Sequence, residues 1–343
     1  MIVVIIAGGS GTRLWPISMP NYPKHLLKLN GDSRSLLQRT YERSLELTDK
    51  IYIISEQGHI MHIKEQLNEL DESRFIVEPA RRGTASCIIA SLAYLSKIYQ
   101  EDEPIIFLSA DHYIRDLKGF KYSFRLASET SKEQNKIVLV GAEPTYPSTG
   151  FGYIKKNDQL NQDSPVFKVD SFKEKPDFET AKHYIESGNY LWNCGYFVGS
   201  IKTFIKTMQK YSIELFNNYN KLIESKNDFK KTYLSFKNST IDYELIEKVE
   251  DLLVVPAAFD WADLGSFKDL HQTIGSDQKE NNIYGDNIEI EEVENSYILN
   301  QDDKPLVVIG LDNVVVVNSK NGVLVTRTDL SQKVGEISKR INK

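Results

Sequence analysis

A glycine-rich stretch that ends on a cation follows an apolar run at the start of the chain. Residues 2–6 read Ile-Val-Val-Ile-Ile, and residues 7–16 read Ala-Gly-Gly-Ser-Gly-Thr-Arg-Leu-Trp-Pro. Three glycines within four positions allow backbone N–H groups to approach a phosphate closely. Arg13 adds a positive charge, and Lys24, in Tyr-Pro-Lys, can bring a second one to the same anion. The stretch therefore predicts an anion-binding loop at the end of a buried strand.

Two better-known glycine loops do not fit this stretch. A Walker loop requires Lys and then Ser or Thr directly after its last glycine, whereas Thr12 and Arg13 follow Gly11. The dinucleotide fingerprint Gly-x-Gly-x-x-Gly can be placed on Gly9 and Gly11, but its third glycine would then fall on Leu14. A tight turn without any ligand is the alternative interpretation of the glycines alone.

A carboxylate follows a second buried run. Residues 104–109 read Pro-Ile-Ile-Phe-Leu-Ser, and Ala110, Asp111 and His112 come next. Ligands of open α/β sheets collect at the carboxyl ends of the strands, so we expect Asp111 to face the same crevice as the glycine loop. Mg²⁺ commonly takes one or two protein carboxylates and completes its shell with water and phosphate. From the residues alone, a helix cap or a turn is the competing interpretation of Asp111.

The elements that must position these residues alternate between strand and helix up to about residue 145. Such alternation predicts an α/β fold with a parallel sheet. We expect Thr84 to cap the apolar helix that runs to about residue 99. From residue 149 to 176 the pattern predicts longer, partly antiparallel elements over the mouth of the sheet. Beyond residue 280, short β-rich pieces separated by Asn, Asp and Gly turns predict stacked strands.

Composition limits the class of protein. The chain has 343 residues, 41% of them hydrophobic and 26% charged, and a net charge of −6, which argues against a nucleic-acid scaffold. The first apolar run is too short for a signal peptide or a membrane span, so we expect a cytoplasmic protein without a membrane partner. Cys87 and Cys194 form no Cys-x-x-Cys pair, so neither a disulfide framework nor a zinc site is expected.

The motifs together resemble a known family. Residues 8–16 and the Tyr-Pro-Lys at 22–24 are similar to the signature of the sugar-1-phosphate nucleotidyltransferases, and the Trp-Pro ending resembles the bacterial mannose-1-phosphate guanylyltransferases in particular. Further matches follow in the family's order, at residues 149–154, 172–176, 192–195 and 259–267. The resemblance implies a Rossmann-like, GT-A-like mixed-sheet nucleotidyltransferase domain in residues 1–280. It also implies a small left-handed β-helix fragment in residues 281–343, as in the short form without an isomerase domain.

The resemblance also implies a role for individual residues. The catalytic cations would be Arg13, Lys24 and Lys175. The nucleotide would be bound by Ala7, Gly8, Gly9, Gly11, Thr12, Glu78, Gly83, Thr84 and Ala85. The sugar phosphate would be bound by Gly152, Glu174, Lys175 and Asn193. Asp111 and Asp263 would hold Mg²⁺ or Mn²⁺; Asp260 is the rival of Asp263, which is preferred because Leu-Gly-Ser follows it as in the family.

The implied reaction is transfer of GMP from GTP to α-D-mannose 1-phosphate, with release of pyrophosphate, by a homodimer. Three alternatives stay open. The first is a guanylyltransferase for another sugar 1-phosphate, such as a heptose 1-phosphate, and the second is a non-catalytic subunit that senses nucleotide sugars. The third, a dinucleotide-dependent oxidoreductase, is disfavoured by the missing third glycine.

Overall fold

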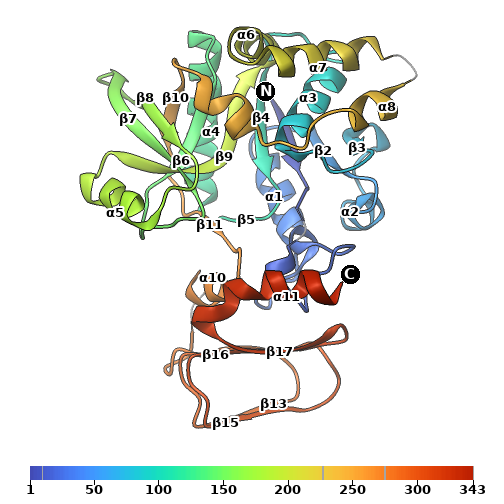
Figure 1. Cartoon of the computed structure of the whole chain (residues 1–343), viewed down its shortest axis with the longest axis vertical. Coiled ribbons are helices and arrows are strands. Elements are labelled where there is room, and N and C mark those ends of the chain that lie inside the picture. Colours follow the sequence, from blue (N-terminus) through green and yellow to red (C-terminus); the bar gives the residue numbers. More distant parts are fainter. Residues whose placement is uncertain (10, 226–227, 274–275, 343) are drawn as a thin grey trace.

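A mixed β-sheet forms the centre of the larger part of the molecule (Figure 1). The computed structural model describes residues 1–9, 11–225, 228–273 and 276–342, so Ser10 of the predicted glycine loop lies outside the described residues. Within them, nine strands pair in the order β3-β2-β1-β4-β9-β6-β10-β8-β7. Their bounds are β1 Ile2–Ile6, β2 Ile51–Glu56, β3 Phe75–Glu78, β4 Pro104–Ser109, β6 Val138–Ala142, β7 Gly152–Asn161, β8 Ser164–Lys173, β9 Tyr190–Ser200 and β10 Leu253–Pro256.

The sheet is parallel on one side and mixed on the other, where β6 and β10 form one parallel pair. The pairs β3–β2, β2–β1 and β1–β4 are parallel, whereas β9 runs antiparallel to β4, β6 and β7, and β8 runs antiparallel to β7 and β10. Helices cover both faces, which is why the strands can be continuous runs of apolar residues. The predicted α/β class and the antiparallel elements are therefore confirmed, but β7 and β8 extend the sheet at its edge and do not lie over its mouth as predicted.

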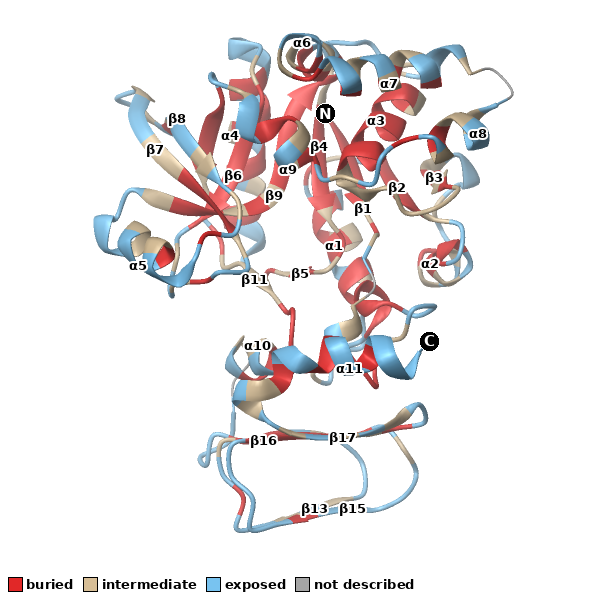
Figure 2. Ribbon diagram, viewed as in Figure 1, coloured by how far each residue is buried: buried red, intermediate tan, exposed pale blue. Residues whose placement is uncertain are grey.

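Alternate residues of β1 contribute to two separate cores. Ile2 and Val4 pack with α3 (Gly83–Leu95), α6 (Ile201–Tyr211) and α7 (Ile213–Glu224), and Val3 and Ile5 pack with α1 (Leu36–Leu45), α2 (Ile60–Gln66) and α4 (Leu117–Gln134). Figure 2 shows the central strands and the inward faces of these helices as buried. The remaining helices of this part are α5 Phe178–Ser187, α8 Phe229–Leu234 and α9 Ile241–Glu244.

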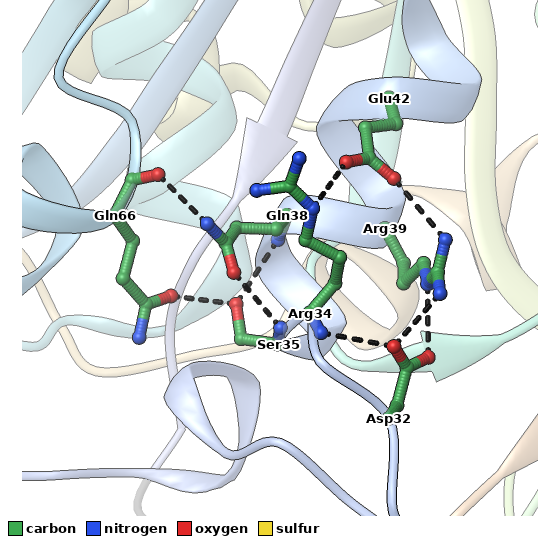
Figure 3. Close-up of polar contacts among 7 residues, drawn as sticks. All are labelled: Asp32, Arg34, Ser35, Gln38, Arg39, Glu42 and Gln66. Carbon is green, nitrogen blue, oxygen red and sulfur yellow. Dashed lines mark hydrogen bonds and ion pairs between the residues drawn. The ribbon is translucent and has the colours of Figure 1, made fainter.

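Side-chain hydrogen bonds fix the start of α1 (Figure 3). Ser35 Oγ accepts from the backbone N–H of Gln38, and Gln38 Oε1 accepts from the backbone N–H of Ser35, which makes a capping box. Gln66, at the end of α2, then accepts from Ser35 Oγ and from Gln38 Nε2. These hydrogen bonds join α1 to the end of α2.

The start of α3 differs from the prediction. The helix begins at Gly83 with Arg82 at the N-cap position, and no side chain caps it. Gly83 has a φ of +80° and packs directly on the backbone of Ser239, a conformation and a contact that favour glycine. Thr84 Oγ1 accepts instead from the backbone N–H of Ile241 at 3.0 Å. The prediction that Thr84 caps this helix was wrong, because the helix begins two residues earlier than that cap requires.

Short strands stack in the C-terminal part. The strands β12 (Asn282–Gly285), β14 (Tyr297–Asn300) and β16 (Val314–Ser319) form one parallel ladder, and β13 (Ile288–Glu291) and β15 (Leu306–Ile309) form a second. The strand β17 (Gly322–Arg327) closes the first ladder in the antiparallel sense. The helix α11 (Val334–Ile341) follows. The predicted stack of short strands is confirmed.

The two parts share an apolar cluster. Phe267 and Leu270, from α10 (Phe267–Thr273), pack against Leu14 and Ile17 of the N-terminal segment and against Tyr297, Val315 and Val317 of the C-terminal ladder. The C-terminal strands are therefore packed on the segment that carries the glycine loop. Among the described helices, none is long and apolar enough to cross a membrane.

Candidate active site

A cavity of about 210 Å³ opens at the carboxyl ends of β1 and β4. Strand ends, loops and the start of α3 contribute to its wall. The lining includes the predicted site residues Thr84, Gly152, Glu174, Lys175, Asn193 and Asp263. A larger cavity, of about 1040 Å³, lies between α10 and the C-terminal ladder and contains none of the predicted residues.

A two-stranded sheet brings the predicted metal ligands together. Asp111 directly precedes β5 (His112–Tyr113), which pairs antiparallel with β11 (Ala262–Asp263) so that Asp263 lies opposite His112. Lys24 Nζ is 2.9 Å from Asp111 Oδ2 and 2.6 Å from Asp263 Oδ1. Three side chains that are far apart in the sequence therefore meet at one point.

The charges of this cluster stabilise one another. Burial opposes ionisation of Asp111 and Asp263, but the Lys24 ammonium outweighs it and lowers the pKa of both carboxyl groups. Burial also opposes the charge of Lys24, and the two carboxylates more than offset it, so that the pKa of Lys24 is raised. All three groups are therefore ionised near neutral pH.

The donor set of this cluster fits Mg²⁺. Two ionised carboxylates at the edge of a cavity are what this ion takes from proteins that leave its other positions to water and phosphate. In the part of the chain that the structure describes, no group of three or more His, Cys, Asp and Glu side chains could hold a metal ion. Asp111 and Asp263 would be the protein ligands of the ion.

Asp260 has a different environment from Asp263. It accepts hydrogen bonds from the backbone N–H groups of Arg115 and Asp116, at 2.9 and 2.8 Å, and from Arg115 Nε at 2.8 Å. Both of its oxygens are thus used to hold the start of α4 against β11. Of the two candidates, Asp263 is the one beside Asp111.

The glycine loop approaches Lys24 closely. Gly11 has a φ of +55°, and a Cβ there would lie 2.7 Å from the backbone nitrogen of Lys24, so only glycine fits without a shift. Arg13 lies in η1 (Thr12–Leu14) and is exposed. Its Nη1 donates to Gln332 Oε1 at 3.3 Å. Gly8 and Gly9 precede this turn and remain partly or fully exposed, whereas Ala7 is buried.

Polar side chains gather on the opposite side of the cavity. Lys175 Nζ lies 2.5 Å from Glu174 Oε1, and Glu174 lies close to Gly152. Asn193 Nδ2 donates to Asp242 Oδ1 at 2.8 Å. Burial, together with the charge of Glu174, raises the pKa of Asp242 to about 6.

The predicted nucleotide residues do not all face the cavity. The side chain of Glu78 is buried and accepts from Tyr233 Oη and Cys87 Sγ, and burial raises its pKa. Ala85 is also buried. Thr84 lines the cavity, so the structure places the start of α3 there but turns the Glu78 carboxyl group into the core.

The cavity wall includes residues that sequence reasoning missed, among them Phe151, Trp261 and Asp242. Phe151 and Trp261 form an aromatic edge contact with ring centroids 5.2 Å apart, and both line the cavity. Asp242 lines the cavity as well. The signal for Asp242 was its place in an acidic and aromatic helix start, but only the fold brings it beside Asn193.

Comparisons with known proteins agree with this geometry. A family model described as Nucleotidyl transferase matches residues 2–280. A mannose-1-phosphate guanylyltransferase from Escherichia coli is 34% identical over 100% of this chain and 76% of its own length. One from Salmonella muenchen is 33% identical over 98% of this chain and 72% of its own length. A crystal structure described as mannose-1-phosphate geranyltransferase, from Thermus thermophilus, superposes with a TM-score of 0.90 at 26% identity and covers 100% of this chain and 99% of its own.

Proposed function

The chain belongs to the nucleotidyl transferase family, and from that premise we propose that it transfers GMP from GTP to α-D-mannose 1-phosphate. The products are GDP-mannose and pyrophosphate. One observation carries the proposal: Lys24 joins Asp111 and Asp263 at the rim of a cavity whose far wall presents Lys175 and Asn193. The site thus offers cations to the phosphates and two carboxylates to a metal ion. It also offers hydrogen-bonding groups to a sugar.

The reaction needs positioning and charge stabilisation, and it needs no protein nucleophile. A phosphate oxygen of the sugar 1-phosphate attacks the α-phosphorus of GTP, and the bond from that phosphorus to the β-phosphate oxygen breaks in line. The electron pair leaves with pyrophosphate. Negative charge spreads over the phosphate oxygens, where fixed cations stabilise it.

Lys24 is assigned to the α-phosphate. An ammonium group has three N–H donors, and two of them are directed at Asp111 and Asp263. The third has no acceptor among the residues that the structure describes, and it would donate to a phosphate oxygen. Mg²⁺ or Mn²⁺, held by the two carboxylates, would neutralise phosphate charge when bound.

The other cations act on the two ends of the reacting groups. Arg13, exposed at the end of the glycine loop, would bind the triphosphate and the leaving pyrophosphate. Lys175 would bind the incoming sugar phosphate, while Glu174 and Asn193 bind sugar hydroxyl groups beside Gly152. Thr84, with the backbone of residues 7–9, 11, 12, 83 and 85, is assigned to the nucleotide, whereas Glu78, whose side chain is buried, is not.

The finer points of architecture belong to the same proposal. We assign residues 1–280 to the catalytic domain and residues 281–343 to a left-handed β-helix fragment, which the two parallel ladders support. A homodimer through this fragment is supported by exposed Val323 and Val325 on its edge strand β17. We also propose that the protein makes GDP-mannose in the cytoplasm.

Pyrophosphate release by the purified protein tests the function. GTP, ATP, UTP and dTTP are each combined with mannose, glucose and heptose 1-phosphates in the presence of Mg²⁺. We expect GTP with mannose 1-phosphate to exceed every other pair by tenfold or more. A lead with another sugar would keep the chemistry and change the substrate, and nucleotide binding without turnover would favour a sensing subunit.

A further inference from the structure

The C-terminal segment lies against the back of the glycine loop. Figure 1 shows α11 between the C-terminal strands and the larger part of the molecule. There it packs on Thr12 and Arg13 of η1, and the turn between β16 and β17 contacts Trp15 and Pro16. Both contacts fall on the segment that carries Arg13.

Gly335 packs directly on the Arg13 side chain. This glycine is buried in α11, and a Cβ at its position would lie 2.8 Å from Arg13 Cγ, a separation at which one of the two atoms must move. Because Cγ is in the middle of the side chain, its displacement would carry the guanidinium group with it. Gln332 adds a direct contact, since its Oε1 accepts from Arg13 Nη1 at 3.3 Å.

A second glycine beside Arg13 comes from the segment that carries Asp263. Gly265 follows Asp263 by two residues, and a Cβ there would lie 3.1 Å from Arg13 Nη2. The Arg13 side chain therefore has Gly335 beside its Cγ and Gly265 beside its guanidinium group, while the residue as a whole stays exposed. This arrangement fixes the direction of the side chain and leaves part of its charged end accessible.

The chain after Arg13 is held by the same C-terminal segment. The carbonyl oxygen of Pro16 accepts from Asn321 Nδ2 at 3.0 Å and from Ser319 Oγ at 3.4 Å. A Cβ at Gly322 would lie 2.7 Å from Trp15 Cζ2, so the indole ring packs against the backbone of this turn. The C-terminal segment thus supports both the side chain and the backbone of the loop.

We propose that Gly335 and Gln332 are positioning residues, which hold Arg13 in the orientation that meets the triphosphate. The inference rests on the proposed function, in which the guanidinium group of Arg13 binds the triphosphate. Displacement of a substrate-binding group by about 1 Å can cost about 100-fold in rate. Alanine is favoured over glycine by up to about 1 kcal/mol within a helix, so Gly335→Ala does not weaken α11 by itself.

A double-mutant cycle on the full chain tests the inference. The variants are Gly335→Ala, Arg13→Ala and the two combined, assayed for kcat and KM with GTP, mannose 1-phosphate and Mg²⁺. Gly58→Ala serves as the matched glycine control, because a Cβ there meets nothing within 4 Å, and Glu336→Ala is an exposed control on α11. Thermal unfolding of each variant reports whether the fold is kept.

We expect Gly335→Ala to lower kcat/KM by about tenfold or more, with a melting temperature like that of the wild type and controls within twofold of it. In the Arg13→Ala background the same change should have no further effect, because its target is gone. An additive loss, or a Gly335→Ala enzyme as active as the controls, would overturn the inference while the function stands.

Two further outcomes separate the inference from its premise. If the wild type releases no pyrophosphate with any sugar 1-phosphate, the proposed function fails. If Arg13→Ala alone leaves activity intact, the role of Arg13 and this inference fall together. If Gly335→Ala does not fold, Gln332→Ala gives the same cycle, because it removes one hydrogen-bond acceptor and adds no volume. A loss of activity seen only when Arg13 is present supports the inference. An equal loss in the Arg13→Ala variant overturns it.

Discussion

At the scale of single residues, Lys24 has two consequences that can be measured separately. Its ammonium group is the shared partner of Asp111 and Asp263. We expect Lys24→Met to lower turnover by about 100-fold or more, the usual cost of one lost donor to a developing charge. The change also leaves two half-buried carboxylates without their cation, which lowers the unfolding free energy by less than the roughly 3–5 kcal/mol that a fully buried pair costs.

Added Mg²⁺ distinguishes these two effects. Because the divalent ion would replace the missing positive charge, the melting temperature of Lys24→Met should rise more with Mg²⁺ than that of the wild type. Turnover should stay low, since the donor to the α-phosphate is still absent. A loss of tenfold or less, or equal responses to Mg²⁺, would contradict the assignment.

Asp242 predicts a dependence of stability on pH. Its pKa in the folded protein is raised to about 6 from 3.8 by burial and by Glu174. A carboxyl group with a raised folded-state pKa contributes stability that is fully present below the unfolded-state pKa and is lost as pH rises through the folded-state pKa. This contribution is therefore largely lost by pH 8.

Asp242→Asn removes this titration. Relative to the wild type, the unfolding free energy of the variant should increase by about 1 kcal/mol between pH 5 and pH 8, as urea unfolding would show. Glu250→Gln, at an exposed carboxylate nearby in the sequence, is the control. A wild-type and variant difference that stays constant with pH would contradict the assignment.

The family resemblance, added to the residue types, was enough to predict that Lys24, Asp111 and Asp263 lie together, but it did not predict the direction of every side chain. Asp111, Asp263 and Lys24 were expected at one site and lie within hydrogen-bond distance there. The Glu78 side chain turned into the core instead, because Tyr233, which no local pattern links to it, supplies a buried donor. A single sequence contains no signal for such a pairing across 155 positions.

At the scale of elements, the short pairing of β5 with β11 decides which aspartate reaches the site. Asp260 anchors the approach to β11 through the backbone N–H groups of Arg115 and Asp116. We expect Asp260→Ala to lower the unfolding free energy by about 1–3 kcal/mol, because two N–H groups lose their acceptor. The Mg²⁺ concentration for half-maximal activity should not change.

Asp263→Asn is the matched opposite variant. It should keep the fold and lose activity together with the response to Mg²⁺, because the amide removes one of two charged ligands. Activity assays over a Mg²⁺ titration, with thermal unfolding alongside, separate the two variants. A shifted Mg²⁺ requirement in Asp260→Ala would mean that Asp260 is the ligand.

The starts of elements were harder to predict than their existence. Ser35 caps α1 through a local capping box with Gln38, whose two partners are three residues apart. Thr84 does not cap α3, because Ser239, from a distant loop, presses against Gly83 and fixes an earlier start. Local signals are reliable where the partner is three residues away, and they fail where the partner comes from another part of the fold.

At the scale of the whole molecule, the stacked C-terminal strands are part of the same structural unit as the glycine loop. Phe267 is fully buried between Leu14 and Tyr297, which belong to the two parts. The sequence predicted the strands but not this contact, since a turn-and-strand pattern does not say what its outer face covers. The closeness of Gly335 to Arg13 is a second consequence of the same packing.

This shared cluster predicts that the two parts lose their structure together. We expect Phe267→Ala to cost about 3–5 kcal/mol and to lower the hydrogen-exchange protection of β1 and of β16 by similar factors. Val308→Ala is the matched control, because Val308 belongs to an apolar cluster formed by the C-terminal strands alone. It should lower the hydrogen-exchange protection mainly of β14, β15 and β16. If Phe267→Ala affects only one part, the C-terminal strands unfold as an independent unit and cannot position the glycine loop. If both parts respond, the site that performs the chemistry includes the C-terminal segment as a structural requirement.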